Sequence, residues 1–278
     1  IQAVRVLNQQ GLLATLDQLG EHTLTSQDAR QATQGILDLL DEIERGGVTA
    51  NVSVKLSQLG LVIDPLLAVT HLRQIVEKAR QSSNFIRVDM EDSSLTDATL
   101  QIVTDLHASG LDNVGTVIQS YLYRSVEDTR RLIEQGIKIR LVKGAYQEPP
   151  HLAYPKKRDV DAAFDRLTDF LLERSLIAEY SSATASGRFP PLAAIATHDE
   201  KRIQYAIEQA KKMNLPVERL EFQMLYGIRR DLQLTLAKQG YPVRVYVPFG
   251  THWYPYFMRR LAERPANVWF FVSNLFQR

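Results

Sequence analysis

The sequence predicts an α/β fold in which a single (βα)₈ TIM-type barrel spans residues 1–278. Two observations lead to this prediction. Eight short runs of apolar and β-branched residues recur along the chain, and segments with helical spacing lie between them. A doubly wound open sheet is the main alternative, but such a sheet usually carries a G-x-G-x-x-G turn after its first strand. The segment 17–23, DQLGEHT, lacks that turn, so the barrel is favoured.

The eight runs have the lengths and residue types of buried strands. They lie at 12–17, 51–57, 85–90, 114–120, 137–144, 192–198, 220–226 and 243–249. Apolar residues three or four positions apart predict helices between them. These helices are expected at 26–45, 68–79, 96–109, 160–171, 203–210, 228–239 and 254–264. Ser125 and Asp128 have capping-box spacing, which predicts a helix after the fourth strand. No change of composition divides the chain, so one domain is expected.

The composition is that of a globular protein with a sizeable core, 45% hydrophobic and 23% charged. A net charge of +1 gives no global field that would attract nucleic acid. The absence of cysteine excludes disulfides, thiolate catalysis and cysteine-ligated metals. No apolar run is long enough to span a membrane, no signal peptide is found in the sequence, and the sequence begins with Ile1 rather than Met.

Polar side chains gather where the predicted strands end, which is where barrels of this class build active sites. Every strand is predicted to begin with apolar residues and to end with polar ones. Arg140 is the most informative, because it lies between Ile139 and Leu141 in a strand that helices should cover. An arginine there points into the mouth of the barrel or needs a buried partner. The polar strand-end residues are Asp17, Lys55, Asp89, Gln119, Arg140, Lys143, Thr197, His198, Gln223, Tyr226 and Tyr246.

Several of these residues also have a purely structural interpretation. Lys55 is explained equally well as a solvated strand end, and Asp89 as the cap of the following turn. His198 and Asp199 have the pattern of a helix start. The convergence of the whole set on one rim favours the functional interpretation.

The rim is rich in cations, which predicts an anionic ligand. Lys55, Arg140, Lys143 and His198 are expected there, and Arg259-Arg260 follow an aromatic segment at 250–258. Arginine pairs with carboxylate or phosphate through two charge-assisted hydrogen bonds. Two adjacent arginines more often form a solvated helix face, so this pair alone would be a weak signal.

A metal site is not expected. The chain has neither H-x-H nor H-E-x-x-H spacing, and most of its histidines are predicted to lie off the rim. A G-x-S-x-G nucleophile turn is also missing.

An ordered set of motifs resembles the proline dehydrogenase family, most of all its short, monofunctional bacterial members. The resemblance runs from about residue 11 to the C-terminus. The motifs are KLSQLG (55–60), VDMED (88–92), VIQSYLYR (117–124), IRLVKGAY (139–146), ATHD (196–199), EFQMLYG (221–227), YVPFG (246–250) and WYPYFMRRLAERPAN (253–267). The resemblance implies a distorted (βα)₈ barrel with its last helix over the C-terminal rim. It also implies a flavoenzyme that oxidises L-proline to pyrroline-5-carboxylate with FAD and passes electrons to a membrane quinone.

The resemblance also implies roles for individual residues. Asp89 and Arg140 would be catalytic, with Asp89 at the substrate end and Arg140 beside the flavin ring near N5. Fixed positive charge there would stabilise the electron-rich reduced ring. Glu21 would be a gate residue that pairs with Arg259. The substrate-binding residues would be Lys55, Tyr146, Leu225, Tyr246, Arg259 and Arg260. The cofactor-binding residues would be Met90, Gln119, Arg140, Lys143, Gly144, Ala145, Thr197, His198 and Gln223.

Two departures from the family pattern stand out. Only about ten residues precede the first strand, whereas family members usually carry additional N-terminal helices. Tyr226 stands where bifunctional relatives carry histidine, which favours the monofunctional branch. The second step, by a pyrroline-5-carboxylate dehydrogenase, is expected on a separate chain. We expect a cytoplasmic protein, peripheral at the inner face of the cell membrane, because quinone is lipid-soluble.

Two other function classes stay open at this stage. A cofactor-free Schiff-base lyase of the aldolase type would use Lys55 or Lys143 as its nucleophile. A non-enzymatic barrel would hold an anionic ligand without turning it over.

Overall fold

A computed structural model describes residues 1–20, 23–178, 184 and 186–250. In it, eight parallel strands form a closed barrel in sequence order, and β1 pairs with β8 to complete the circle. The strands are β1 (Leu13–Gln18), β2 (Ala50–Val54), β3 (Ile86–Val88), β4 (Val114–Gln119), β5 (Ile139–Val142), β6 (Ala193–Ala196), β7 (Leu220–Leu225) and β8 (Val243–Phe249). The predicted barrel is therefore confirmed.

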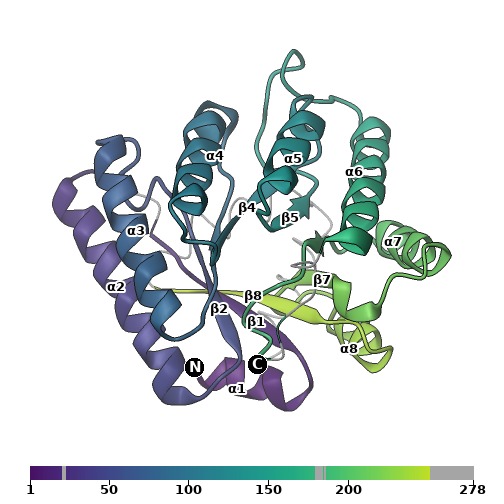
Figure 1. Cartoon of the computed structure of the whole chain (residues 1–278), viewed down its shortest axis with the longest axis horizontal. Coiled ribbons are helices and arrows are strands. Elements are labelled where there is room, and N and C mark those ends of the chain that lie inside the picture. The colour runs from purple at the N-terminus through teal and green to yellow at the C-terminus, as the bar shows by residue number, and fades with distance from the viewer. Residues whose placement is uncertain (21–22, 179–183, 185, 251–278) are drawn as a thin grey trace, which may run out of the picture.

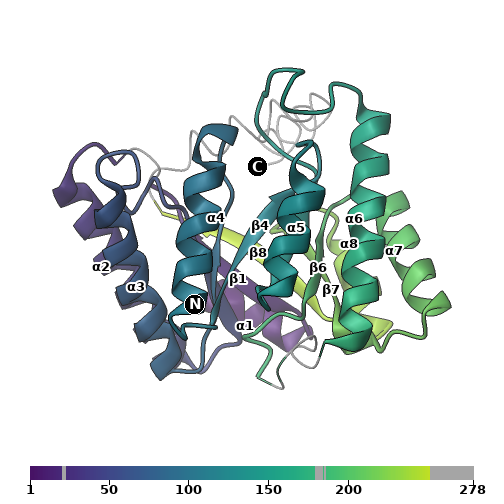
Figure 2. The ribbon, with the colours of Figure 1, turned by 45° about the horizontal axis from the view of Figure 1, so that its top comes forward.

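Helices cover the outside of the strands, as Figures 1 and 2 show. They are α2 (Ser26–Gly46), α3 (Pro65–Gln81), α4 (Ser93–Ala108), α5 (Ser125–Glu134), α6 (Lys157–Ile177), α7 (Glu200–Lys212) and α8 (Arg230–Lys238), with a short 3₁₀ turn at Val217–Arg219. Their buried faces pack against outward-pointing strand residues in one continuous apolar core. The helix predicted at 254–264 lies outside the described residues, as does its expected position over the rim. None of the described helices has the length and apolar character needed to cross a membrane.

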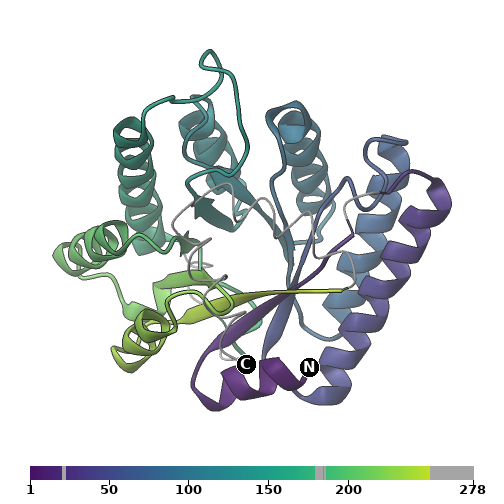
Figure 3. The ribbon, with the colours of Figure 1, turned by 180° about the vertical axis from the view of Figure 1, so that it is seen from behind.

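One helix was not predicted, the short α1 (Gln2–Gln9), which lies beside the start of β1 (Figure 3). It buries Val4 and Leu7 in the core. The Asn8 side chain donates to the carbonyls of Leu12 and Thr49 and accepts from the Thr49 backbone N–H. This helix therefore covers the end of the barrel at which the strands begin.

The strands from β2 to β7 are shorter than predicted at the ends where polar residues follow. β3 has 3 residues and ends at Val88, so Asp89 and Met90 come after it. β2 ends at Val54, directly before Lys55. A backbone that leaves the sheet as its polar residues begin can direct those side chains over the mouth of the barrel.

The capping box predicted at the start of α5 is wrong. Ser125 lies within the helix and donates its hydroxyl to the carbonyl of Gln119, while Asp128 pairs with Arg124. Both side chains are thus occupied in fixing the turn after β4.

A capping box occurs instead at the start of α2. The Thr25 hydroxyl accepts from the Asp28 N–H at 3.2 Å, and Asp28 accepts from the Thr25 N–H at 2.9 Å. These two bonds satisfy backbone donors that a helix start otherwise leaves unpaired. The side-chain and backbone hydrogen bonds from Thr25 hold the pKa of Asp28 below its ordinary value of 3.8.

This cap should make stability depend on acid. Because the folded-state pKa of Asp28 is lowered, its stabilisation is complete above pH 3.8 and disappears as the pH falls through the folded-state pKa. Asp28→Asn should lower the melting temperature at neutral pH, and the gap to wild type should narrow below about pH 4. Thermal unfolding followed by circular dichroism at several pH values measures this. Asp38→Asn, in the middle of the same helix, is the control, and a gap for Asp28→Asn that does not vary with pH would contradict the prediction.

Candidate active site

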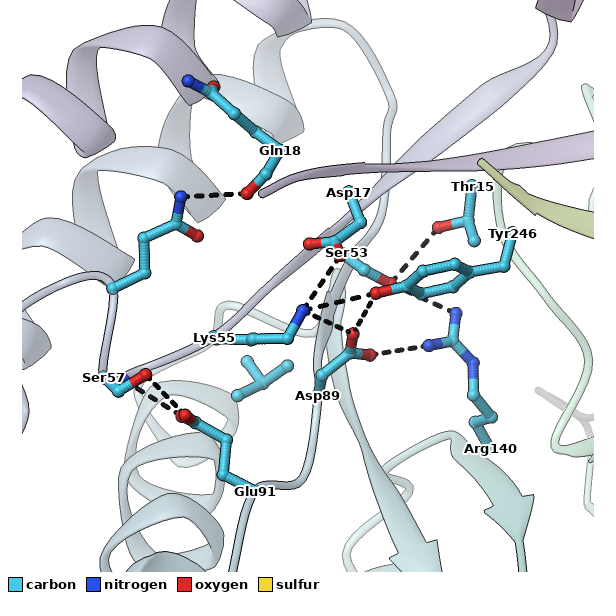
Figure 4. A network of polar contacts seen from close by, with 12 residues as sticks. Thr15, Asp17, Gln18, Ser53, Lys55, Ser57, Asp89, Glu91, Arg140 and Tyr246 are labelled. Carbon is cyan, nitrogen blue, oxygen red and sulfur yellow. Dashed lines mark hydrogen bonds and ion pairs between the residues drawn. The ribbon is translucent and has the colours of Figure 1, made fainter. Parts of the chain in front are cut away.

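Opposite charges meet at the mouth of the barrel (Figure 4). The Lys55 ammonium group lies 2.9 Å from the Asp17 carboxylate and 3.5 Å from the Asp89 carboxylate. Lys55 is 8% exposed and Asp17 is 0% exposed, so neither is a solvated surface group. Buried charges of this kind are stable only when they are paired and hydrogen-bonded.

Arg140 is the centre of the same network. Its Nη1 donates to Asp89 at 2.6 Å, its Nε donates to Gln223 Oε1 at 2.5 Å, and its Nη2 donates to Ser53 Oγ at 3.2 Å. The guanidinium also lies 5.4 Å from the centre of the Tyr246 ring, within cation–π range. The predicted buried partner of Arg140 is therefore present, and it joins β2, β5, β7 and β8 with the residue that follows β3.

The protonation states in the network follow from burial. Burial raises the pKa of Asp17 above its ordinary value, and the charge of Lys55 opposes that rise. Burial and the nearby Asp17 and Asp89 raise the pKa of Tyr246 well above its ordinary value. Tyr246 is thus a neutral phenol that donates to Asp89 at 2.8 Å and accepts from Lys55 at 3.3 Å. The Tyr246 phenol therefore keeps its proton beside the two carboxylates and acts as a hydrogen-bond donor.

The structural interpretations of the rim are correct at some positions and wrong at others. Asp89 does not cap a turn, since Asp92 caps α4 through the Ser94 N–H. Asp199 is the N-cap of α7, as the helix-start pattern predicted. His198 Nε2 accepts from the Leu225 N–H at 2.9 Å, which fixes the half-buried Leu225 at the end of β7. Thr197 Oγ1 accepts from the Asp199 N–H at 3.1 Å.

Lys143 belongs to a second cluster of charges. Its ammonium group lies 2.5 Å from Asp161 and 2.6 Å from Asp199. Lys157 also pairs with Asp161, so the cluster holds two lysines and two aspartates. Lys143 is therefore balanced by carboxylates, and an anionic ligand would have to displace at least one of them.

Other predicted residues lie at or after the ends of β3, β4 and β5. Gln119 is buried and donates from Nε2 to the Glu91 carbonyl at 2.9 Å, and Met90 belongs to the core. Ala145 and Tyr146 are half-buried in the segment after β5. The gate residue Glu21 and the arginines Arg259 and Arg260 lie outside the described residues, so the expected Glu21–Arg259 pair stays a prediction.

Packing within the protein gives a reason for glycine at position 144. A Cβ at this position would collide with the ring of Tyr121, and the backbone has a φ of +125°. The glycine is thus required by its own left-handed conformation and by the packing of Tyr121.

Three buried charged residues near the strand starts were not among the predicted site residues. Arg87, Glu221 and Arg244 are the second residues of β3, β7 and β8, each after an apolar first residue, and they are fully buried inside the barrel. Arg87 donates to the carbonyls of Thr116 and Lys138, and burial lowers its pKa well below the ordinary value. The sequence feature that could have revealed these residues is the alternation of polar and apolar residues within the strands, which places every second side chain inside the barrel.

Within the described part of the chain, no group of three or more His, Cys, Asp or Glu side chains is arranged to hold a metal ion. A closed parallel barrel whose strand ends bring ionised side chains together has the architecture of the (βα)₈ enzymes. The profile of the family described as proline dehydrogenase matches residues 1–272. The chain belongs to the proline dehydrogenase family.

Curated relatives support this membership over the full length. The chain is 39% identical to proline dehydrogenase 1 of Bacillus subtilis (strain 168), covering 100% of this chain and 87% of that protein. It is 40% identical to the proline dehydrogenase of Deinococcus radiodurans, covering 99% of this chain and 85% of that protein.

A solved structure gives the same fold. A crystal structure of proline utilization A (PutA) from Bdellovibrio bacteriovorus, inactivated by N-propargylglycine, has a TM-score of 0.83 and 25% identity to this chain. The match covers 96% of this chain and 31% of that one, so the chain spans less than a third of that PutA.

The Gly144 environment gives a direct test. Gly144→Ala should lower the free energy of unfolding by about 1–3 kcal/mol, because it adds both backbone strain and a clash with Tyr121. Gly110→Ala is the matched control, since Gly110 has a φ of +89° but nothing within 4 Å of its missing Cβ. Chemical denaturation measures both. Equal losses in the two variants would show that the Tyr121 contact does not matter.

Proposed function

We propose that this protein oxidises L-proline to pyrroline-5-carboxylate, with FAD as hydride acceptor and a membrane quinone as the final electron acceptor. Membership of the proline dehydrogenase family supports the substrate and the reaction. The observation that carries the proposal is the buried Arg140, held between Asp89 and Gln223 at the mouth of the barrel.

The side chains at the mouth fit a flavin in the chemistry of their donors. Arg140 is a fixed cation in a buried setting, 5% exposed, and Gln119 and Gln223 are buried polar neighbours on β4 and β7. When bound, FAD supplies a two-electron acceptor that becomes electron-rich on reduction. Arg140 would stabilise that negative charge, because its position is fixed by three hydrogen-bond acceptors before the reaction begins.

Lys143 is proposed to hold the phosphate part of the cofactor, together with the neighbouring Gly144, Ala145, Thr197 and His198. Lys143 is partly exposed and lies between Asp161 and Asp199. A phosphate group that replaced one aspartate would leave the charge of the lysine compensated. Met90 would contact the cofactor from the end of β3.

The substrate would bind near Lys55, away from the Lys143 cluster that is proposed to hold the cofactor phosphate. Lys55 would bind the carboxylate of proline with Arg259 and Arg260, and Asp89 would hold Lys55, Arg140 and Tyr246 in their relative positions. The ring of proline would pack against Tyr146, Leu225 and Tyr246. Tyr246 combines an apolar face for this contact with a hydroxyl that is already hydrogen-bonded.

The Schiff-base alternative is less well supported. A nucleophilic lysine must be neutral, which a low-dielectric pocket or a nearby cation favours. Lys55 and Lys143 each lie within ion-pair distance of two carboxylates instead, which is not the setting of such a nucleophile.

The test of the proposed function is spectroscopic. The purified chain should be yellow, or become yellow with FAD, and anaerobic L-proline should bleach the flavin band. D-proline is a matched control for substrate geometry. Trapping of a carbonyl substrate on Lys55 or Lys143 by borohydride, in a colourless protein that does not take up FAD, would replace the flavin proposal with the lyase.

The arginine pair gives a separate prediction. Arg259→Lys or Arg260→Lys should raise the KM for proline at least about tenfold while FAD stays bound, because lysine keeps the charge but loses the two-pronged hydrogen-bonding group. Steady-state kinetics and flavin content measure the two effects. Wild-type KM values in both variants would exclude these arginines from the carboxylate site.

A further inference from the structure

A fully buried ion pair lies near the beginning of β7 and β8, away from the mouth of the barrel. Glu221 and Arg244 are each 0% exposed. The Arg244 Nε and Nη2 atoms donate to the two oxygens of Glu221, both at 2.9 Å. Arg244 also donates to the carbonyls of Ala14 and Gly187. This pair has the two-bond geometry that makes a buried arginine–carboxylate contact stable.

Glu221 is also the start of a hydrogen-bonded chain that reaches Arg140. Glu221 and Gln223 are two residues apart on β7, so their side chains lie on the same face of the strand, inside the barrel. Gln223 Nε2 donates to Glu221 Oε1 at 2.5 Å, and Gln223 Oε1 accepts from Arg140 Nε at 2.5 Å. Arg140 in turn donates to Asp89 at 2.6 Å.

The chemistry of the two end groups allows one orientation of the amide between them. An ionised carboxylate can only accept hydrogen bonds, and a guanidinium can only donate them. The NH₂ group of Gln223 must therefore face Glu221, and its oxygen must face Arg140. Without the carboxylate at position 221, the amide could rotate and present its NH₂ group to the guanidinium, where donor would meet donor.

We infer that Glu221 is a positioning residue for the reaction: it orients the Gln223 amide, and through it the Arg140 guanidinium, beside the flavin. This inference rests on the proposed function. Glu221 acts from inside the barrel, two residues before Gln223. Loss of this anchor should leave proline binding nearly intact while it weakens the stabilisation of the reduced flavin.

The test must separate this role from a simple loss of stability. The double variant Glu221→Leu/Arg244→Met removes both buried charges at once, which is often tolerated, whereas one removed partner would leave an unpaired charge. Gln223→Met breaks the chain one link later and keeps the Glu221–Arg244 pair intact. Leu72→Ala is the control for stability alone, because it truncates a buried residue of α3 that is not part of the hydrogen-bonded chain from Glu221 to Arg140.

Three properties of the FAD-loaded proteins are measured: the reduction potential of the flavin, its anaerobic rate of reduction by proline, and the KM for proline. In both test variants, proline should reduce the flavin at least about tenfold more slowly than in wild type. The flavin potential should be more negative, and the KM for proline should stay within about twofold of wild type. Leu72→Ala should keep the wild-type potential.

A wild-type potential and reduction rate in Gln223→Met would overturn the inference, whether or not the double variant folds. A double variant that matches Leu72→Ala in all three properties would also overturn it. If the wild-type protein binds FAD and is reduced by proline, but the two test variants keep its potential and reduction rate, this inference fails and the proposed function stands. A wild-type protein that takes up no flavin would defeat both.

Discussion

The ion pair between Arg140 and Asp89 determines how the rest of the site is arranged. An unpaired charge would be costly inside the barrel, because removing an isolated charge from water costs far more than one hydrogen bond returns. Asp89 therefore gathers Lys55, Tyr246 and Arg140 around one carboxylate, and Arg140 gathers Ser53 and Gln223. Four strands (β2, β5, β7 and β8) and the end of β3 are fixed relative to one another by this mutual compensation.

The interior of this barrel is consequently a column of polar contacts. Side chains on alternate positions of the strands bond to one another from Arg244 and Glu221 through Gln223 and Arg140 to Asp89. Hydroxyl side chains also meet there, as in the contact between Thr15 and Ser53 at 3.3 Å. The apolar core lies instead between the strands and the helices.

The fold could be predicted because its signals are local. Strand runs, helical spacing and the lack of a nucleotide turn can each be seen in a few neighbouring residues. The buried setting of Arg140 could be predicted in the same way, since an arginine between two apolar strand residues points into the barrel mouth or needs a buried partner. Its partners Asp89 and Gln223, however, come from the end of β3 and from β7, which do not pair with β5, and the closure of the barrel brings them together in its interior. The functions of Glu221 and Arg244 were missed for the same reason, although their alternation with apolar neighbours was visible. The capping box was misplaced because Thr25 and Ser125 both fit the pattern, but Thr25 is the N-cap of α2 whereas Ser125 already lies inside α5.

The two buried charge clusters differ in how easily their partners can change. Glu221 and Arg244 are closed off from solvent, and the remaining Arg244 donors are satisfied by backbone carbonyls that cannot leave. Lys55 lies at the mouth, and its contacts to Asp17, Tyr246 and Asp89 lengthen from 2.9 to 3.3 and 3.5 Å. On the proposed function, the carboxylate of proline replaces one acid at Lys55 with another, so binding exchanges partners without leaving Lys55 unpaired. A rigid cluster inside the barrel and an exchangeable one at its mouth are what such a reaction requires, since the cation beside the flavin must stay fixed while the cation that binds substrate must release it.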